Sequence, residues 1–187
     1  MRSVDLHRER ARSKLTFAVF VVSSSRHAAK SRGEAFVDES GDLAVSLVES
    51  AGHRVVERDV LPDSLEEIAE ALKRVAGKVD VVLFLGGTGP HPKDVTVEAV
   101  RPSLTKELPG FGELFRMLSY EQVGPAAFLS RATAGVADGS VVFCLPGSPD
   151  GIRLALEKLI LPEAEHAVWV ARGYRHRHGH GGHEGGE

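Results

Sequence analysis

The chain has 187 residues and contains no asparagine, one glutamine and one cysteine. Depletion of thermolabile amides is a mark of hyperthermophile proteins, so the composition favours a hot source. The single cysteine, Cys144, cannot form an intramolecular disulfide, which suits a reducing compartment. Because Cys144 lies within the apolar run Val141 to Leu145, we interpret it as a buried structural thiol rather than a nucleophile.

A long apolar run and a strong excess of one charge are also missing. The first apolar run, residues 15–22, is too short to cross a bilayer and lacks the cleavage-site pattern of a signal peptide. The formal net charge of -3 gives no support for a general nucleic-acid surface. We therefore expect a cytoplasmic protein that binds neither a membrane nor nucleic acid.

The two ends of the chain differ in composition from its centre. Residues 1–14 are charged without a clear apolar period, which predicts a mobile N-terminal arm or one ordered only by a neighbouring subunit. Residues 173–187 form a tail rich in histidine and glycine that is predicted to be disordered, since it has no apolar residue beyond Tyr174. Its four histidines suit loose binding of a transition metal, and a solubilising role or a cloning remnant explains them equally well. One domain is expected over residues 15–172.

Within this domain, apolar strands alternate with amphipathic helices. Strands are expected at residues 15–22, 53–60 and 79–85, and helices at 40–51 and 65–76. Such alternation predicts an α/β fold with a parallel sheet covered by helices on both faces.

Several local features complete the predicted fold. Residues 23–39 are polar and predict a loop, after which Ser40 is an N-cap candidate. Pro125 is expected to start a short helix that contains Ser130 and Arg131. Asp138-Gly139 suits a type I′ turn between two strands. The last amphipathic helix is expected to stop near Pro162.

The segment 79–96 carries the clearest functional signal. A buried strand there runs into a loop of four residues: Gly86, Gly87, Thr88 and Gly89. Glycines after a strand allow the backbone to approach a ligand closely, and their amides can face an anion. A tight connection without a ligand is the alternative, and these residues alone leave the two interpretations even.

Other polar groups follow the predicted strands. Ser23, Asp59 and the pair Gly147-Ser148 stand at strand ends, and such ends meet at one edge of a doubly wound sheet. Hydroxyls and amides there suit a phosphate-bearing ligand, and the carboxylates of Asp59 and Asp94 suit Mg²⁺. The plain alternatives are a polar loop for Ser23, a turn for Asp59 and a helix cap for Asp94.

These blocks resemble the molybdenum-cofactor-biosynthesis family, in its MogA/MoaB-type molybdopterin-binding domain. The matching blocks are Gly86–Gly89 with Asp94–Thr96 and Glu98–Ala99, then 109–116, 129–131 and 145–149, in the same order, with Asp38–Gly41 before them. The resemblance runs from about residue 15 to residue 169, and residues 115–120 favour the MoaB branch. Ser23-Ser24-Ser25 departs from the Ser-Asp-Ser that relatives often carry.

The resemblance implies a three-layer, doubly wound, mostly parallel fold and a homo-trimer or hexamer. It also implies Mg²⁺- and ATP-dependent adenylylation of molybdopterin, with a MoeA-like metal insertase as a further partner. Asp94 and Asp59 fall where the family has two functionally important aspartates, so both are predicted as catalytic residues and metal ligands.

The resemblance and the strand-end pattern together give a set of predicted ligand contacts. They are Gly86, Gly87, Thr88, Gly89, Ser23, Ser40, Gly41, Thr96, Glu113, Arg116, Ser130, Arg131, Gly147 and Ser148. Arg131 suits a phosphate especially well. Glu113 and Arg116 are equally well explained as an i,i+3 salt bridge on a helix.

Two other functions fit the same residues. One is a molybdopterin-binding carrier of the MoaB branch that has lost turnover. The other is a nucleotide-hydrolysing relative that uses the same domain on another pyrophosphate substrate.

Overall fold

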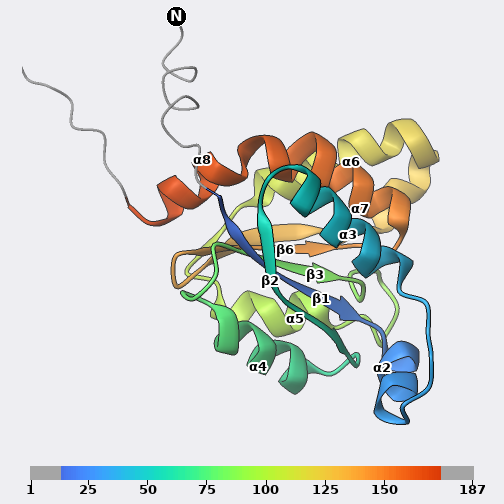
Figure 1. The fold of residues 1–187 in the computed structure, drawn as a ribbon. Coiled ribbons are helices and arrows are strands. Elements are labelled where there is room, and N and C mark those ends of the chain that lie inside the picture. The colour runs from blue at the N-terminus through green and yellow to red at the C-terminus, as the bar shows by residue number, and fades with distance from the viewer. Residues whose placement is uncertain (1–13, 174–187) are drawn as a thin grey trace, which may run out of the picture.

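The computed structural model describes residues 14–173, which form one six-stranded sheet with helices on both sides (Figure 1). The strands are β1 (Thr16–Val22), β2 (Arg54–Leu61), β3 (Val81–Leu85), β4 (Lys106–Glu107), β5 (Thr133–Ala137) and β6 (Ser140–Leu145). Their order is β2-β1-β3-β6-β5-β4, in which the first four are parallel and β5 is antiparallel to both neighbours. The predicted α/β fold with a mostly parallel sheet is confirmed. The predicted arm and tail fall almost entirely outside the described residues.

Helices cover both faces of this sheet. They are α2 (Ser24–Ser31), α3 (Glu39–Ser50), α4 (Leu65–Val75), α5 (Thr96–Val100), η1 (Arg101–Ser103), α6 (Pro109–Val123), η2 (Gly124–Leu129), α7 (Pro149–Ala155), the π-helix η3 (Leu156–Ile160) and α8 (Leu161–Ala171). In Figure 1, α4 and α5 lie on one side of the sheet, and α3, α6, α7 and α8 lie on the other. The three-layer arrangement is therefore confirmed. No helix in this part of the chain is long and apolar enough to cross a membrane.

The sheet is buried because successive side chains of a strand point to opposite faces, and both faces are covered. On β1, Phe17 packs into the core under α3, α7 and α8. Phe20, three residues later on the same strand, packs into the core under α4 and α5, with its ring centroid 5.3 Å from that of Phe84. All five residues of β3 are buried, as the continuous apolar run before the glycine loop predicts.

The parallel strands end at a common edge. Val21 of β1 pairs with Val60 of β2 and with Leu85 of β3, and Leu85 pairs with Leu145 of β6. The segments that follow these strands therefore meet at this edge, as ligand-binding segments do in open α/β sheets.

The segment after β1 differs from its prediction. Residues 24–31 form the helix α2, although a polar loop is expected there. The reason is a distant partner: the carboxylate of Asp63 accepts hydrogen bonds from the Ser24 amide at 3.0 Å and the Ser24 hydroxyl at 2.6 Å. Since the first amides of a helix lack partners within it, this contact stabilises the start of α2.

Two helix ends also differ from the predictions. The N-cap of α3 is Asp38 rather than Ser40, and the Asp38 carboxylate accepts the Gly41 amide at 3.1 Å. The last helix does not stop at Pro162 but continues to Ala171. Pro162 is accommodated because it stands in the first turn of α8, directly after the π-helix, where a missing backbone donor costs little.

Candidate functional site

The candidate site lies at the edge where the four parallel strands end. Gly86 follows β3, and its amide donates to the Leu145 carbonyl at the end of β6 at 2.9 Å. A Cβ atom on Gly147, which follows β6, would lie 3.3 Å from the Cα of Gly86. The segments after β3 and β6 are thus in backbone contact, as the sequence predicts for groups at strand ends.

The loop after β3 requires glycine at its first two positions. Gly86 and Gly87 have φ angles of 112° and 64°, values that residues with side chains rarely adopt. A Cβ on Gly86 would lie 2.5 Å from the Val22 carbonyl oxygen, and one on Gly87 would lie 2.4 Å from the Thr96 hydroxyl oxygen. Hence both glycines are required by the loop itself, whatever ligand it binds.

Thr96 donates two hydrogen bonds to the backbone of this loop. Its side chain is fully buried, and its hydroxyl donates to the Gly86 carbonyl at 2.8 Å. Its amide donates to the Gly87 carbonyl at 3.1 Å. Thr96 was predicted to contact the ligand, but its observed contacts are with the loop, so the structure gives it a supporting position.

Asp94 follows the loop in sequence, and its carboxylate lies close to Gly89. A Cβ on Gly89 would lie 2.8 Å from Oδ2 of Asp94, and that oxygen accepts the His91 amide at 3.1 Å. The Asp94 amide donates in turn to the His91 carbonyl at 2.8 Å. Asp94 does not cap α5, whose N-cap is Val95. The alternative of a simple helix cap is therefore wrong, and the carboxylate belongs to the loop.

Arg131 reaches this loop from the segment before β5. It follows η2 instead of lying within it, so the predicted short helix ends before Ser130. Its guanidinium donates to the Gly89 and Asp94 carbonyls, each at 3.0 Å, and pairs with the Glu98 carboxylate. Most of the donors of Arg131 therefore face the loop and Glu98.

A cavity of about 380 Å³ adjoins Arg131. Four predicted ligand residues line it together: Glu113, Arg116, Ser130 and Arg131. Phe128, 74% exposed, stands on its wall. Arg116 donates to the Ala132 carbonyl at 3.2 Å and forms no ion pair with Glu113 among the described residues. The salt-bridge alternative for Glu113 and Arg116 is therefore wrong.

The start of α3 reaches the segment after β6. Ser40 is buried, and its hydroxyl donates to the Gly147 carbonyl at 2.6 Å. Gly41 lies so close to Asp38 that a Cβ would be 2.1 Å from its carboxylate oxygen. Ser148 caps α7 by accepting the Gly151 amide at 3.3 Å. These side chains are thus placed at the predicted edge, and their observed hydrogen bonds join its segments.

Asp59 occupies a different hollow from Arg131 and Glu113. It lines a cavity of about 410 Å³ with Lys30, Asp38 and Arg58 among others. Its carboxylate pairs with Lys30 and accepts the Val60 amide at 2.7 Å. Burial acts to raise the pKa of Asp59, but these two hydrogen bonds and nearby cationic charge outweigh it and hold that pKa below its ordinary value.

Ser23 links β1 to α2. Its amide donates to the Leu61 carbonyl at 2.8 Å, and its hydroxyl lies 3.3 Å from that of Ser25. Ser23 therefore stands at the predicted strand-end edge, on the side of β2.

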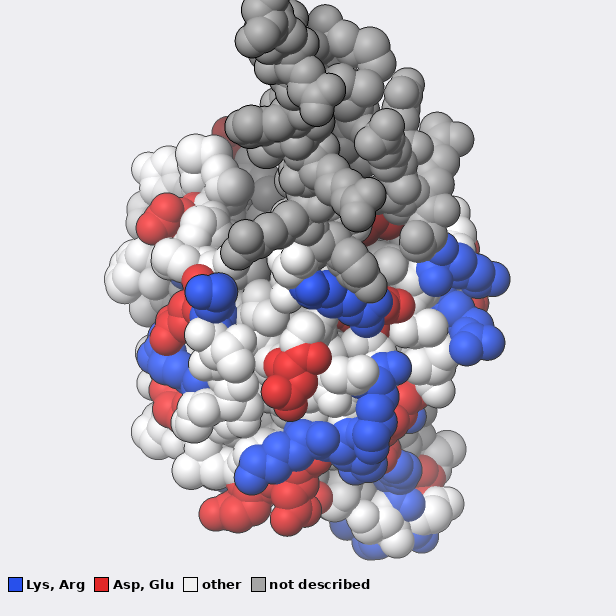
Figure 2. All heavy atoms as spheres, turned by 90° about the vertical axis from the view of Figure 1, so that its left-hand side faces the viewer, with Lys and Arg blue, Asp and Glu red and all other residues white. Residues whose placement is uncertain are grey.

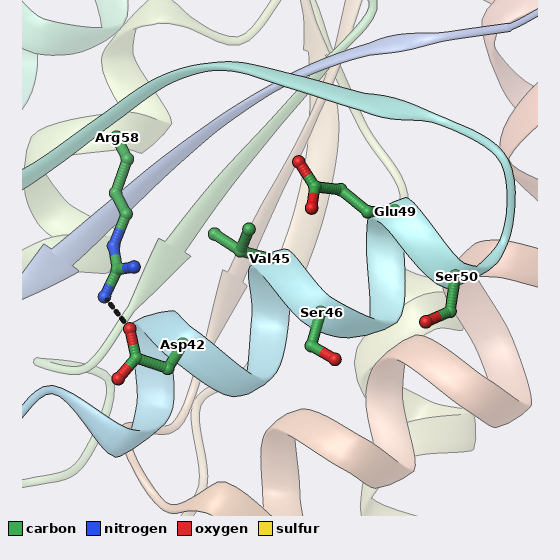
Figure 3. A pocket seen from close by; sticks show the side chains of 6 residues that line it. All are labelled: Asp42, Val45, Ser46, Glu49, Ser50 and Arg58. Atoms are coloured by element: carbon green, nitrogen blue, oxygen red, sulfur yellow. Dashed lines mark ion pairs between the residues drawn. The ribbon is translucent and has the colours of Figure 1, made fainter.

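A third hollow of about 450 Å³ lies outside α3. Figure 3 shows Asp42, Ser46 and Glu49 along α3, with Arg58 reaching over from β2. Arg58 pairs with Asp42 at 2.8 Å and with the buried Asp38 at 2.6 Å. Because its cation is already shared by two carboxylates, we assign this hollow no ligand.

A family model described as "Probable molybdopterin binding domain" matches residues 18–166. The chain belongs to this family. Molybdenum cofactor biosynthesis protein B of Halalkalibacterium halodurans is 42% identical over 169 residues, covering 89% of this chain and 95% of the relative. The protein of the same name from Bacillus subtilis is 42% identical over 171 residues, with the same coverage.

Solved structures agree with this assignment. The tungsten cofactor synthesizing protein MoaB from Pyrococcus furiosus has a TM-score of 0.75 and 38% identity, covering 86% of this chain and 98% of its own. The molybdopterin biosynthesis Mog protein from Mycobacterium ulcerans has a TM-score of 0.74 and 30% identity, covering 87% and 100%. The predicted membership of the MoaB/MogA family and the predicted fold are therefore confirmed.

The described residues contain no preformed metal-binding cluster. Among residues 14–173, no group of three or more His, Cys, Asp or Glu side chains is arranged to hold a metal. Mg²⁺ at phosphate-handling sites is usually held by one or two carboxylates together with the substrate phosphates. Asp94 at the loop suits that form of binding, whereas Asp59 lines a separate hollow and pairs with Lys30.

Side chains of both charges occur on the face shown in Figure 2, and basic side chains form a band across its lower half. Basic and acidic side chains lie next to each other there. Two basic side chains pair with acidic ones at short distances: Arg172 with Asp80 at 2.6 Å and Arg74 with Glu57 at 2.5 Å. Ion pairs with acidic side chains therefore neutralise part of the basic charge of the described residues.

Two charged partners of the predicted site residues could not be predicted from the sequence. Glu98 lies within a matching block, but nothing local indicates that it faces Arg131, 33 positions later. Lys30 stands in a segment predicted as a loop, so nothing in the sequence indicates its ion pair with Asp59, 29 positions later.

Proposed function

We propose that this protein adenylylates molybdopterin with ATP and releases pyrophosphate. The observation that carries the proposal is the loop of Gly86 to Gly89 closed by Asp94. Its first two residues have no room for side chains, and it lies against Gly147 at the edge where the parallel strands end. The relatives support the proposal through their names, which refer to molybdenum or tungsten cofactor synthesis.

The proposed chemistry is one phosphoryl-group substitution. An oxygen of the terminal phosphate of molybdopterin bonds to the α-phosphorus of ATP, and the bond from that phosphorus to the bridging oxygen breaks. Pyrophosphate leaves with the electron pair, and adenylyl-molybdopterin is the other product. Such reactions depend mainly on positioning and on neutralising charge.

We assign roles to the residues accordingly. The backbone of Gly86, Gly87, Thr88 and Gly89 is assigned to the phosphates, because a glycine-rich loop leaves backbone amides uncovered by side chains. Asp94 would hold Mg²⁺ at the nucleotide phosphates, and Asp59 would be a second carboxylate for Mg²⁺ from the separate hollow that it lines. When bound, Mg²⁺ neutralises charge on the phosphates.

The test is direct formation of the product. Purified protein is incubated with molybdopterin, ATP and Mg²⁺, and adenylyl-molybdopterin and pyrophosphate are measured. Asp94→Asn is expected to abolish turnover, because the amide that replaces the carboxylate is a poor Mg²⁺ ligand. Asp138→Asn is the matched control, since Asp138 lies in the hairpin turn at φ 48°, a conformation that asparagine also adopts. No product from the unchanged protein would refute the proposal.

A second function is favoured by the Lys30–Asp59 ion pair. One of the two carboxylates proposed for Mg²⁺ is already neutralised by a cation of the same chain. A protein that binds and carries molybdopterin without turnover would need no Mg²⁺ there. Molybdopterin binding without adenylyl transfer, unaffected by Asp94→Asn, would identify such a carrier.

We also propose that the protein works as a homo-oligomer, a trimer or hexamer, and delivers its product to a MoeA-like metal insertase. What supports the oligomer is an exposed apolar face formed by α6 and η2, here called the α6 face. Its members are Leu114, Met117, Tyr120, Val123, Phe128 and Leu129, each at least 45% exposed. Large exposed apolar patches mark protein interfaces more often than free surface.

A further inference from the structure

Arg131 donates hydrogen bonds to the backbone of three residues from Thr88 to Asp94. Its amide donates to the Thr88 carbonyl at 3.0 Å. Its Nε donates to the Gly89 carbonyl and its Nη2 to the Asp94 carbonyl, each at 3.0 Å. One residue therefore fixes both ends of the segment from Gly89 to Asp94.

Glu98 fixes the guanidinium in turn. Nη2 of Arg131 donates to Oε2 of Glu98 at 3.2 Å, and Nη1 pairs with Oε1. The hydrogen bond from Arg131 lowers the pKa of Glu98 below its ordinary value. Both partners therefore stay charged at neutral pH, and the planar guanidinium is held in one orientation.

These contacts leave little of the guanidinium for a ligand. An arginine side chain has five N–H donors. Four are used here: one on Gly89, one on Asp94 and two on Glu98. A lysine has three donors on one nitrogen atom, so it cannot reach the same four oxygen atoms of Gly89, Asp94 and Glu98.

We propose that Arg131, held by Glu98, is a positioning residue that fixes the Gly89–Asp94 segment and does not itself bind the substrate phosphate. This inference rests on the proposed adenylyl transfer and replaces the phosphate contact that the sequence predicts for Arg131. Asp94 is the residue through which it acts, because the orientation of the Asp94 carboxylate depends on the His91 amide within the same segment.

The test compares three single variants. Arg131→Lys keeps the charge but loses the span, and Glu98→Gln keeps the shape but loses the charge that orients Arg131. Arg32→Lys is the matched control, because Arg32 also forms a two-point contact with a glutamate, Glu34, but contacts none of the loop residues described above. Steady-state kinetics give kcat and KM, and hydrogen exchange reports the amides of His91 and Asp94.

We expect kcat to fall about tenfold or more in Arg131→Lys, since small misplacement of a reacting group has effects of this size. The KM for molybdopterin should change by less than about twofold, because the proposed role leaves binding intact. Glu98→Gln should lower kcat in the same way. The double variant should lose no more than about the larger single loss, because the two residues act as one unit. Exchange at His91 and Asp94 should be faster in both variants and unchanged in Arg32→Lys.

Two results would overturn the inference. One is a raised KM with unchanged kcat in Arg131→Lys, together with full activity of Glu98→Gln, which indicates direct phosphate binding. The other is unchanged hydrogen exchange in both variants. If the unchanged protein forms no adenylyl-molybdopterin while the variants still exchange faster, Arg131 does fix the loop and the proposed function alone is refuted.

Discussion

Gly87 is under two separate constraints, and their effects on stability can be measured apart. Its φ of 64° is strained for any residue with a side chain, at about 1–2 kcal/mol. A Cβ there would also displace the hydroxyl of Thr96, a buried hydrogen-bond donor worth about 1–3 kcal/mol. Gly87→Ala is therefore expected to lower the free energy of unfolding by about 3 kcal/mol, measured by urea denaturation.

Gly33→Ala separates the two constraints. Gly33 has a similar φ of 70°, but a Cβ there meets no atom within 4 Å. This variant should lose only the strain, about 1–2 kcal/mol. Equal losses at Gly33 and Gly87 would show that the contact with Thr96 contributes nothing.

Lys30 is expected to compete with Mg²⁺ for the carboxylate of Asp59. Lys30→Met removes the ammonium and keeps an apolar side chain of similar length. Exposed ion pairs contribute roughly 0.2–1 kcal/mol, so the Mg²⁺ concentration for half-maximal adenylyl transfer should fall up to about fivefold. Lys73→Met, on α4, is the control. An unchanged Mg²⁺ dependence in Lys30→Met would show that Asp59 does not hold the metal.

Single residues were predictable where their own chemistry carries the signal. The glycines of the loop and Asp94 stand together in sequence, so their association needs no knowledge of the fold. The contacts of Ser40 and Arg131 could not be foreseen, because their partners lie 107 and 42 positions away. Their residue types suit a ligand and a neighbouring carbonyl equally well, and only the folded chain decides between these two partners.

One carboxylate joins three secondary-structure elements at the opposite edge of the sheet. Asp80, just before β3, accepts the amide of Thr16 in β1 at 2.6 Å and pairs with Arg172 at the end of α8 at 2.6 Å. Burial acts to raise the pKa of Asp80, but these partners outweigh it and hold the pKa below its ordinary value of 3.8. Asp80 is mostly buried, with 13% of its side chain exposed.

The stability that Asp80 contributes should therefore depend on pH. Because its pKa is lower in the folded state, this contribution is complete well above pH 4 and is lost as the pH falls through the folded-state pKa. Asp80→Asn should lower the free energy of unfolding by about 1–2 kcal/mol at pH 7 and flatten its decline in acid. Denaturation at pH 7 and below pH 4 measures both effects. Asp150→Asn, at an exposed carboxyl, should leave the acid decline unchanged.

Secondary-structure elements were predictable where apolar period and turn chemistry agree. Ser64 caps the start of α4 by accepting the Glu67 amide, and Asp138-Gly139 joins β5 to β6 with both residues at positive φ. α2 was missed because its start is stabilised by Asp63, which is far away in sequence. The two-residue strand β4 was missed because a segment of this length has no period.

The assembled protein is expected to depend on the α6 face. Met117, 57% exposed, lies on this face, and a charge there would have to be buried in any contact between copies. Met117→Glu should reduce the particle from a trimer or hexamer to the 20.1 kDa monomer, measured by sedimentation. Leu65→Glu, at a 44% exposed position on the opposite side of the sheet, is the control. A monomeric unchanged protein would refute the oligomer.

The architecture as a whole was the most predictable property. Alternating strand and helix patterns fix which faces are apolar, and a parallel sheet covered on both sides follows. The reversal of β5 relative to β6 was indicated by the hairpin turn. Which hollows form between the elements was not predictable, because Asp59 and Arg131 line separate cavities that depend on side-chain packing.

Cys144, the one cysteine of the sequence, can report transient opening of the centre of the sheet. Cys144 in β6 is 1% exposed, and burial raises its pKa to about 12. Since only an accessible thiolate reacts with disulfide reagents, the labelling rate follows the small fraction of molecules in which the centre of the sheet has opened. A ligand that binds the folded state should slow labelling in proportion to its occupancy. Binding of ATP, which has no thiol of its own, can therefore be tested without an engineered label, even in variants that no longer turn over.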